Sequence, residues 1–204
     1  MNRTLLIFSF LIFSLFYGHS QGFNAGLQAG ILGSQVDGDT YVGYNKPGLF
    51  AGGFVNRPLS SKLLLQLEIN FIQKGSKDIN NQTGFKYKLA MNYVEVPFFI
   101  CYKYKYKIQV EAGLSFGYLI NATESDNNGI VTGNPSFNKF ELSWLGGMSY
   151  PLTQKLSVGI RYLYTAFFTP VRSNPTNNYY LYITKRGEYN NLVIFLLRYQ
   201  LHSS

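Results

Sequence analysis

The sequence has few charged side chains and few of the residue types on which catalysis commonly depends. Charged residues make up 14% of the 204 residues, against roughly 25% in a soluble domain. The single cysteine, Cys101, excludes an internal disulfide framework and a multi-cysteine metal site. Of the two histidines, His19 lies in an expected leader and His202 is two residues from the end. We therefore expect no enzymatic activity and no cofactor or metal.

Long hydrophobic runs are also scarce, and the one present lies at the start. Arg3 is followed by an apolar run from Leu5 to Tyr17 and then by Gly18-His19-Ser20. This pattern predicts a secretory signal peptide over residues 1–20, cleaved after Ser20, and one domain over residues 21–204. The alternative is a membrane anchor, but a run of about 13 residues is shorter than the roughly 20 that span a bilayer.

What the chain does contain is aromatic residues and alternating hydrophobicity. Aromatics account for 17%, with 17 Tyr and 17 Phe. The clearest alternation runs from Tyr106 to Asn121, where apolar side chains occupy one face and Lys107, Gln109 and Glu111 begin the other. An exported chain with strands of this length, and no second long apolar run, is typical of a transmembrane barrel whose apolar face meets lipid.

Eight segments share this alternation and are predicted strands. Glycines in the second segment, and Leu192, Ile194 and Leu196 in the eighth, leave the facing of those two strands open. The predicted strands are Phe23–Val36, Gly48–Asn56, Leu63–Gln73, Lys88–Tyr102, Tyr106–Asn121, Lys139–Tyr150, Lys155–Tyr164 and Tyr189–Leu201.

The connections between these segments alternate strictly between short and long. Arg57–Lys62, Lys103–Lys105 and Pro151–Gln154 are short, whereas Asp37–Lys46, Lys74–Tyr87, Thr123–Asn138 and Ala166–Glu188 are long and polar. We predict an all-β, eight-stranded antiparallel up-and-down β-barrel in the outer membrane of a Gram-negative bacterium. Its short turns and both termini would be periplasmic and its long loops extracellular. A secreted lipocalin-like soluble barrel is the alternative, but it would carry apolar residues inside.

Charged residues recur at inward positions of different predicted strands: Glu68, Glu95, Glu111, Glu141, Arg161 and Arg198. We interpret them as an ion-pair network that plugs the interior, because isolated buried ions cost several kcal/mol. The functional alternative is a narrow gated pore in which the pairs exchange partners. These six residues carry two positive and four negative charges, so the predicted interior has too few cations to balance its carboxylates. Lys107, a protonated carboxyl, or water with Gln66 could compensate.

The predicted long loops and one strand carry further candidates. Pro97 predicts a bulge or a strand end, because proline removes a ladder donor. Tyrosines in the last loop suit protein recognition or packing over the barrel mouth: Tyr179, Tyr180 and Tyr182. Basic residues predict either a solvated rim or contact with lipopolysaccharide phosphates. They are Lys46, Lys74, Lys77, Lys86, Arg172, Lys185 and Arg186.

Three patches resemble the PorT-like family of outer-membrane β-barrel proteins. They are Tyr93–Phe99, Leu67–Gly75 and Ile160–Tyr162, and the likeness spans the residues after the leader. The resemblance implies an outer-membrane location and an association with protein secretion across that membrane. We therefore expect a membrane scaffold or partner-docking component, in contact with outer-membrane lipid, lipopolysaccharide and envelope or secretion proteins. We expect no nucleic-acid partner, although the net charge is +8.

Overall fold

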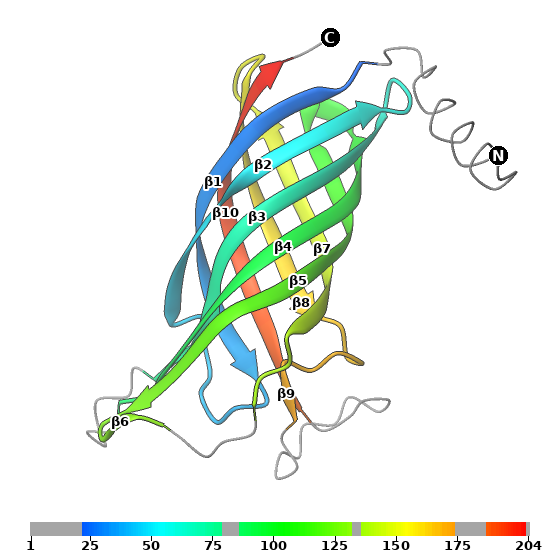
Figure 1. Cartoon of the computed structure of the whole chain (residues 1–204). Coiled ribbons are helices and arrows are strands. Elements are labelled where there is room, and N and C mark those ends of the chain that lie inside the picture. Colours follow the sequence, from blue (N-terminus) through cyan, green and yellow to red (C-terminus); the bar gives the residue numbers. More distant parts are fainter. Residues whose placement is uncertain (1–21, 79–85, 132–135, 174–186, 203–204) are drawn as a thin grey trace, which may run out of the picture.

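Eight long antiparallel strands close into a barrel in this computed structural model, which describes residues 22–78, 86–131, 136–173 and 187–202. Each long strand pairs with its neighbour along the chain, and β1 also pairs with β10, which closes the sheet (Figure 1). The predicted fold class is therefore confirmed. The expected leader and Tyr179, Tyr180, Tyr182, Lys185 and Arg186 lie outside the described residues.

The long strands contain 10 to 18 residues, whereas a tilted strand needs about 9–11 to cross a bilayer. Among the described residues, no helix is long and apolar enough to cross a membrane. The long strands are β1 (Asn24–Asp37), β2 (Lys46–Pro58), β3 (Leu63–Lys77), β4 (Lys88–Lys103), β5 (Gln109–Asp126), β7 (Phe140–Pro151), β8 (Leu156–Thr165) and β10 (Gly187–His202). Two short strands, β6 (Gly129–Ile130) and β9 (Arg172–Ser173), extend the sheet beyond β5 and β10.

Alternating side chains sort into an apolar outer surface and a closed interior. In β4, Val94, Val96 and Phe98 are 37–53% exposed, while Tyr93 and Glu95 between them are at most 1% exposed. Successive residues of a strand face opposite sides, so this pattern places aliphatic and aromatic groups around the outside of the barrel. Such an outer band is what a lipid-facing surface requires.

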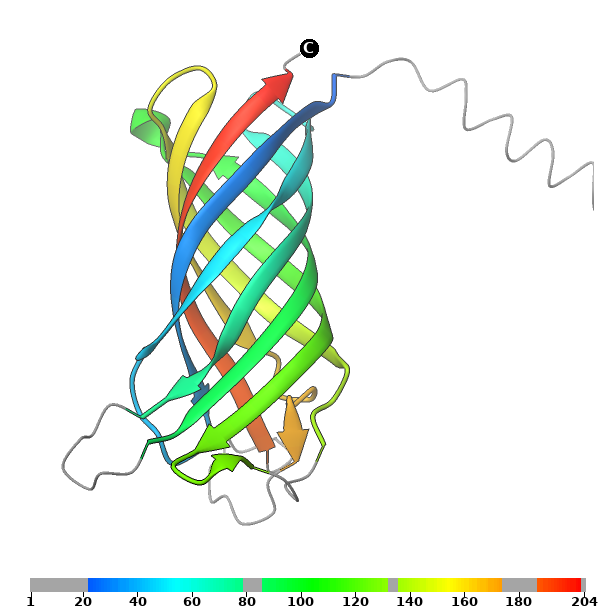
Figure 2. The same cartoon turned by 60° about the vertical axis from the view of Figure 1, so that its left-hand side comes forward.

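The three short turns lie at the end of the barrel where β1 begins and β10 ends, and the loops lie at the other end (Figures 1 and 2). We call these the turn end and the loop end. The turn between β4 and β5 contains a single 3-10 turn, η3 (Lys105–Lys107), in which Tyr106 and Lys107 have positive φ. Both residues were predicted to start the fifth strand. Instead they are exposed in the turn, so Lys107 does not reach the interior.

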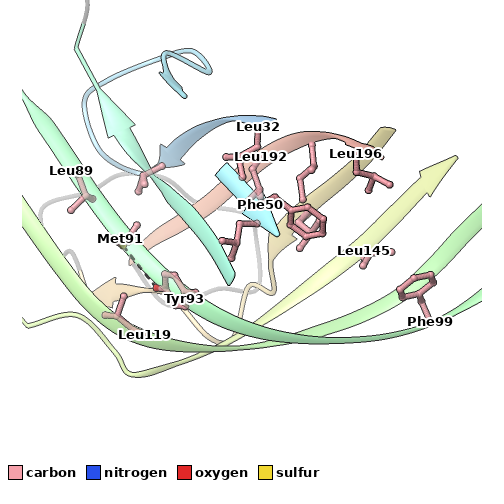
Figure 3. Close-up of a cluster of buried hydrophobic side chains, with 14 of the residues drawn as sticks. Leu32, Phe50, Leu89, Met91, Tyr93, Phe99, Leu119, Leu145, Leu192 and Leu196 are labelled. Carbon is pink, nitrogen blue, oxygen red and sulfur yellow. Dashed lines mark hydrogen bonds between the residues drawn. The ribbon is translucent and has the colours of Figure 1, made fainter. Parts of the chain in front are cut away.

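The alternation predicted a uniformly polar interior, but the interior also contains apolar side chains. A cluster of buried apolar side chains fills part of it (Figure 3). Leu192, Ile194 and Leu196 of β10 belong to it, while Phe195 and Leu197 point outward. The eighth strand thus carries apolar residues on both faces, which is why its alternation is blurred. Other members include Leu32, Phe50, Ile72, Leu89, Met91, Tyr93, Leu119, Leu145 and Leu163.

Pro97 lies within β4 and forms neither the bulge nor the strand end that the sequence predicted. The β3–β4 ladder is interrupted between the pairs Leu67–Phe98 and Asn70–Glu95, but its register is the same on both sides. Proline has no N–H to donate, so it removes a ladder bond without adding a residue. The register shift that does occur lies between Asn92 and Tyr93, in the β4–β5 ladder.

Candidate functional site

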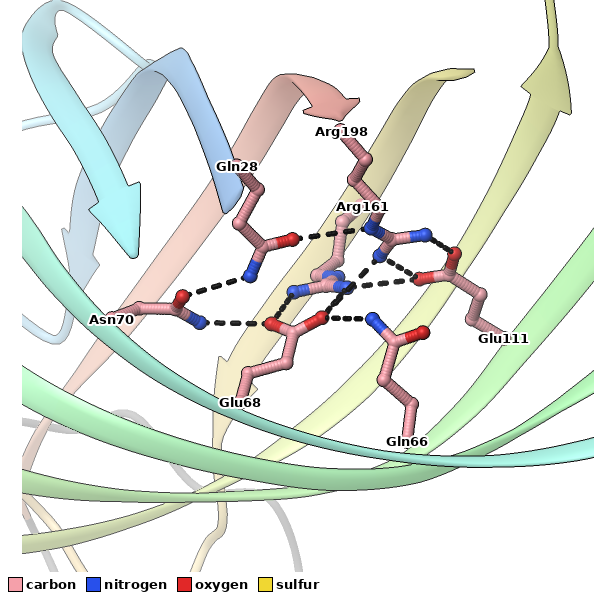
Figure 4. A network of polar contacts seen from close by, with 7 residues as sticks. All are labelled: Gln28, Gln66, Glu68, Asn70, Glu111, Arg161 and Arg198. Carbon is pink, nitrogen blue, oxygen red and sulfur yellow. Dashed lines mark hydrogen bonds and ion pairs between the residues drawn. The ribbon is translucent and has the colours of Figure 1, made fainter. Parts of the chain in front are cut away.

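The first ion cluster joins two arginines and two glutamates across the interior (Figure 4). Arg161 of β8 donates to both carboxylate oxygens of Glu68 of β3, at 2.8 and 3.0 Å, and to Glu111 of β5 at 3.0 Å. Arg198 of β10 makes a two-point ion pair with the same Glu111. All four side chains are buried, so each charge is matched at close range.

Amide side chains complete this cluster into a ring. Arg198 Nε donates to Gln28, whose amide donates to Asn70, and Asn70 donates to Glu68 at 2.8 Å. Gln66 donates to the other oxygen of Glu68 at 2.7 Å. Each carboxylate therefore accepts several hydrogen bonds, which offsets the cost of removing it from water.

An aromatic ring lies against both guanidinium groups. Phe99 has its ring centroid 4.8 Å from Arg161 Cζ and 5.9 Å from Arg198 Cζ. Gly113 on the neighbouring strand β5 makes room for it, because a Cβ there would lie 2.4 Å from Cβ of Phe99. Arginine over an aromatic face is favourable, so these contacts add to the stabilisation of both arginines in the interior.

The second ion cluster is built on Lys74 of β3. Its ammonium lies 2.5 Å from Glu95 of β4 and 3.1 Å from Glu141 of β7, and it is fully buried. Glu141 also accepts hydrogen bonds from three neutral side chains, Ser143, Thr165 and Asn190, at 2.6–2.9 Å. Lys74 also lies over the ring of Tyr93, with 4.7 Å from Nζ to the centroid.

These two clusters contain all six residues that the sequence singled out for the interior. They also supply the missing positive charge, because Lys74 is the third interior cation. Lys74 was predicted to lie in a loop, either at a solvated rim or in contact with lipopolysaccharide. It lies inside because β3 extends to Lys77, and position 74 shares the inward face with Glu68, Asn70 and Ile72. Extending the alternation along the strand would have identified it.

A third cluster lies at the loop end. Arg172 of β9 pairs with Glu188 of β10 through two bonds of 2.9 Å and with Glu124 of β5 at 2.8 Å. Tyr87 donates to Glu124 at 2.8 Å and stacks on Tyr41 with 4.2 Å between ring centroids. These contacts tie five separate segments together over the barrel mouth: β9, β10, β5, the residues before β4 and the β1–β2 loop.

Burial shifts the pKa of groups at this end. Burial raises the pKa of Asp39, in the β1–β2 loop, to about 6, and the nearby carboxylates of Glu188 and Asp37 act in the same direction. A hydrogen bond from the backbone N–H of Tyr41 partly opposes this shift. Burial also raises the pKa of the Tyr87 hydroxyl, and its hydrogen bond to Glu124 raises it further.

The remaining predicted rim residues divide into two groups. Lys77 and Lys86 are exposed at the loop end. Lys46 and Arg172 were expected there as well, but both are buried. Lys46 starts β2 with its Nζ 3.5 Å from the carbonyl oxygen of Gln73, and Arg172 is held by the two glutamates described above. Counting positive charges in loops could not separate exposed residues from paired ones.

Within the described ranges, no group of three or more His, Cys, Asp or Glu side chains is placed to hold a metal ion. A closed antiparallel barrel with an apolar exterior and ion-paired interior is the architecture of a transmembrane barrel of the outer membrane. The sequence model of the outer membrane protein beta-barrel domain matches residues 17–168, and the chain belongs to this family. No curated protein matches the chain in sequence.

Solved structures of outer-membrane proteins resemble this chain at low sequence identity. The attachment invasion locus protein Ail of Yersinia pestis is 10% identical, with a TM-score of 0.52, over 87% of this chain and 98% of that chain. Neisserial surface protein A is 12% identical, with a TM-score of 0.47, over 87% of this chain and 96% of its own. The likeness to Ail supports the barrel fold, and the family match places the protein in the outer membrane.

Proposed function

We propose that this protein is a closed, non-enzymatic outer-membrane barrel that serves as a membrane scaffold and docks a partner protein. The observation that carries the proposal is the filled interior. Two ion clusters and an apolar cluster occupy the space through which a solute would have to pass. The interior of an eight-stranded barrel is narrow enough for side chains to fill.

Conductance across a planar bilayer tests the closed interior. The folded protein should give no steady current, and Arg161→Ala should introduce current if the ion cluster is the barrier. Arg57→Ala at the turn end is the matched control, since it removes an arginine without touching the clusters. A steady current through the unaltered protein would contradict a closed barrel.

The second candidate function is a narrow gated pore. It is favoured by the excess of one carboxylate in the interior, where Glu95 and Glu141 share the single ammonium of Lys74. Exchange of partners there would open a polar path. Voltage-dependent current that changes with Glu141→Gln would support the pore and would count against the scaffold.

The docking part of the proposal concerns the loop end. Val42, Ile130 and Phe168 lie in or beside the loops and are 88%, 74% and 51% exposed. Apolar groups in loops beyond the strands are suited to a protein contact. The resemblance to PorT-like proteins suggests a component of a secretion assembly as the partner. Lys77 and Lys86, exposed nearby, suit contact with lipopolysaccharide phosphates.

Migration in a mild detergent tests docking. The protein should run as part of a larger complex, and Val42→Ser with Ile130→Ser should release it as a monomer. Asn128→Ser, in the same region but polar, is the control. Barrel folding in each variant is checked by the shift in gel mobility on boiling. A lone monomer for the unaltered protein would contradict the docking role.

The proposal includes an orientation: turn end and both termini periplasmic, loop end extracellular, with residues 1–20 removed as a leader. The alternation of short turns with long loops supports it. Protease added to intact cells should cut the long loops, and the amino-terminal sequence of the purified protein should start after Ser20. Cleavage at the short turns in intact cells would reverse the orientation.

A further inference from the structure

The positive charge of the protein is concentrated at the turn end. The interior clusters hold three cations and four carboxylates. In the sequence of the loop end, eight basic side chains, Lys185 and Arg186 included, stand against six acidic ones, a net charge of only +2. The three short turns contain no Asp or Glu. The turns and the strand ends beside them carry six basic residues: Arg57, Lys62, Lys103, Lys105, Lys107 and Lys155.

One of these turns alternates tyrosine with lysine: Tyr102-Lys103-Tyr104-Lys105-Tyr106-Lys107. All six side chains are exposed, and Tyr106 is 84% exposed. Tyr106 and Lys107 have φ values of 59° and 66° and are the only residues other than glycine with positive φ among the described residues. A left-handed conformation is unfavourable for such side chains, so the turn holds Tyr106 outward at some cost in backbone energy.

We propose that this turn, with the other basic residues of the turn end, binds acidic phospholipid headgroups of the membrane leaflet that surrounds it. The lysine ammonium groups would meet headgroup phosphates, and Tyr104 and Tyr106 would insert at the level of the glycerol backbone. The assignment of this lipid site to the periplasmic leaflet rests on the orientation proposed above. The affinity for acidic lipid itself does not depend on orientation.

Lipid is the ligand favoured by the position of these residues. Tyr102 is the last residue of β4 on the apolar outer face, so the turn begins where the lipid-facing surface ends. Tyrosine is enriched at this depth in membrane proteins, and lysine extends its ammonium toward phosphates from there. The basic residues also lie on three turns around the circumference, which suits a surrounding leaflet better than a single docked protein.

The barrel mouth at the turn end is also lined by basic residues. A cavity of about 350 Å³ opens there, and Lys103, Lys155 and Arg198 are among its lining residues. No Asp or Glu lines it, and its remaining polar groups are mainly amides and hydroxyls. Carboxylates that could neutralise the turn lysines from the inside are therefore lacking in the described part of this mouth, which leaves these lysines available to external anions.

Electron paramagnetic resonance of spin-labelled lipids tests the proposal. The folded protein is placed in phosphatidylcholine bilayers with spin-labelled phosphatidylglycerol or phosphatidylcholine as the probe. At low salt, we expect phosphatidylglycerol to associate with the protein about twofold more strongly than phosphatidylcholine, or more. The two lipids should become nearly equal at roughly 0.5 M salt. The combined change Lys103→Gln, Lys105→Gln and Lys107→Gln should lower the ratio clearly, and the preference that remains should come from Arg57, Lys62 and Lys155.

Two control variants make the outcome decisive. Arginine at the same three positions should keep the preference, because the charge is kept. Glutamine at Lys88 and Lys139, two exposed loop-end residues, should leave the ratio unchanged, whereas Lys103→Gln with Lys105→Gln, which removes equal charge from the turn end, should lower it. No preference in the unaltered protein, or an equal loss in the loop-end variant, would overturn the proposal. Reversed orientation in cells would move the site to the other leaflet without altering this measurement.

Discussion

Arg161 and Glu68 stand 93 positions apart in the sequence and meet in the barrel interior through two parallel hydrogen bonds of 2.8 and 3.0 Å. Their strands, β8 and β3, are not neighbours in the sheet, so the pair spans the interior. Ladder hydrogen bonds cannot connect these two walls. The pair therefore links two opposite walls of the barrel directly.

Removing Arg161 should destabilise the barrel strongly. Arg161→Met leaves Glu68 and Glu111 with Arg198 as their remaining cation, and loss of one member of a buried ion pair costs about 3–5 kcal/mol. Unfolding by urea in detergent micelles, followed through Trp144 fluorescence, measures this loss. Lys155→Met, at an exposed site, should change stability by less than about 0.5 kcal/mol. Combining Arg161→Met with Glu68→Gln should cost less than the sum of both changes, because the orphaned charge is then removed.

Lys74 and Lys77 provide a test within one strand. Lys74→Met should lower the free energy of unfolding by about 3 kcal/mol, since Glu95 and Glu141 would repel each other without a cation. Lys77→Met should have little effect, because that side chain is exposed. Equal effects of the two substitutions in the same urea titration would show that Lys74 is not confined to the interior.

Asp39 should make the loop end sensitive to pH. Its folded pKa of about 6 exceeds the ordinary value of 3.8, so the folded state binds this proton more tightly than the unfolded chain does. The stability contributed by protonated Asp39 is therefore full below about pH 4 and is lost as the pH rises through about 6.

The Asp39→Asn variant isolates this contribution. It keeps the side-chain oxygen that accepts from the Tyr41 N–H but cannot ionise. The difference in free energy of unfolding, variant minus unaltered protein, should increase by about 1–2 kcal/mol when the pH is raised from 4 to 8. This figure allows for solvent screening. Urea midpoints at both pH values measure the difference. Parallel pH dependence in the two proteins would show that Asp39 does not titrate in this range.

Cys101 should report barrel closure directly. Its side chain is 0% exposed and faces inward from β4. A maleimide should therefore not label the folded protein in detergent and should label it completely in urea. Leu152→Cys in the Cys101→Ser background, at an exposed turn residue, is the accessible control. Rapid labelling of folded Cys101 would indicate an open turn-end mouth.

Much of the fold could be predicted because strand alternation and connection length depend on local sequence. Glu68, Glu95, Glu111 and Glu141 could all be assigned to the inner face by the two-residue period alone. The prediction was less accurate at strand ends, where Lys74 was placed in a loop. Gly75, with φ of 140°, follows it directly and resembles a turn signal in the sequence. In the structure β3 continues past it to Lys77.

The partners of individual charges could not be predicted, because they depend on which strands face each other across the interior. Arg172 meets Glu124, 48 positions away, only after the loop returns over the mouth. The apolar interior cluster was missed for a related reason. In the sequence, Leu192 and Ile194 form one uninterrupted apolar run with their outward-facing neighbours. Such a run has no alternation, so it does not show which of its side chains face the interior.

The uneven charge of the two ends bears on how the barrel enters the membrane. In the orientation proposed above, the loop end must pass through the hydrocarbon layer, whereas the turn end stays on the side of entry. Transfer of an unmatched charge through that layer is costly. In the sequence, the loop end has six acidic and eight basic side chains, against six basic and no acidic ones at the turn end, and Arg172, Glu124 and Glu188 are already paired. The unmatched lysines of the turns never need to cross, so the energy barrier to insertion is lower in this direction than in reverse.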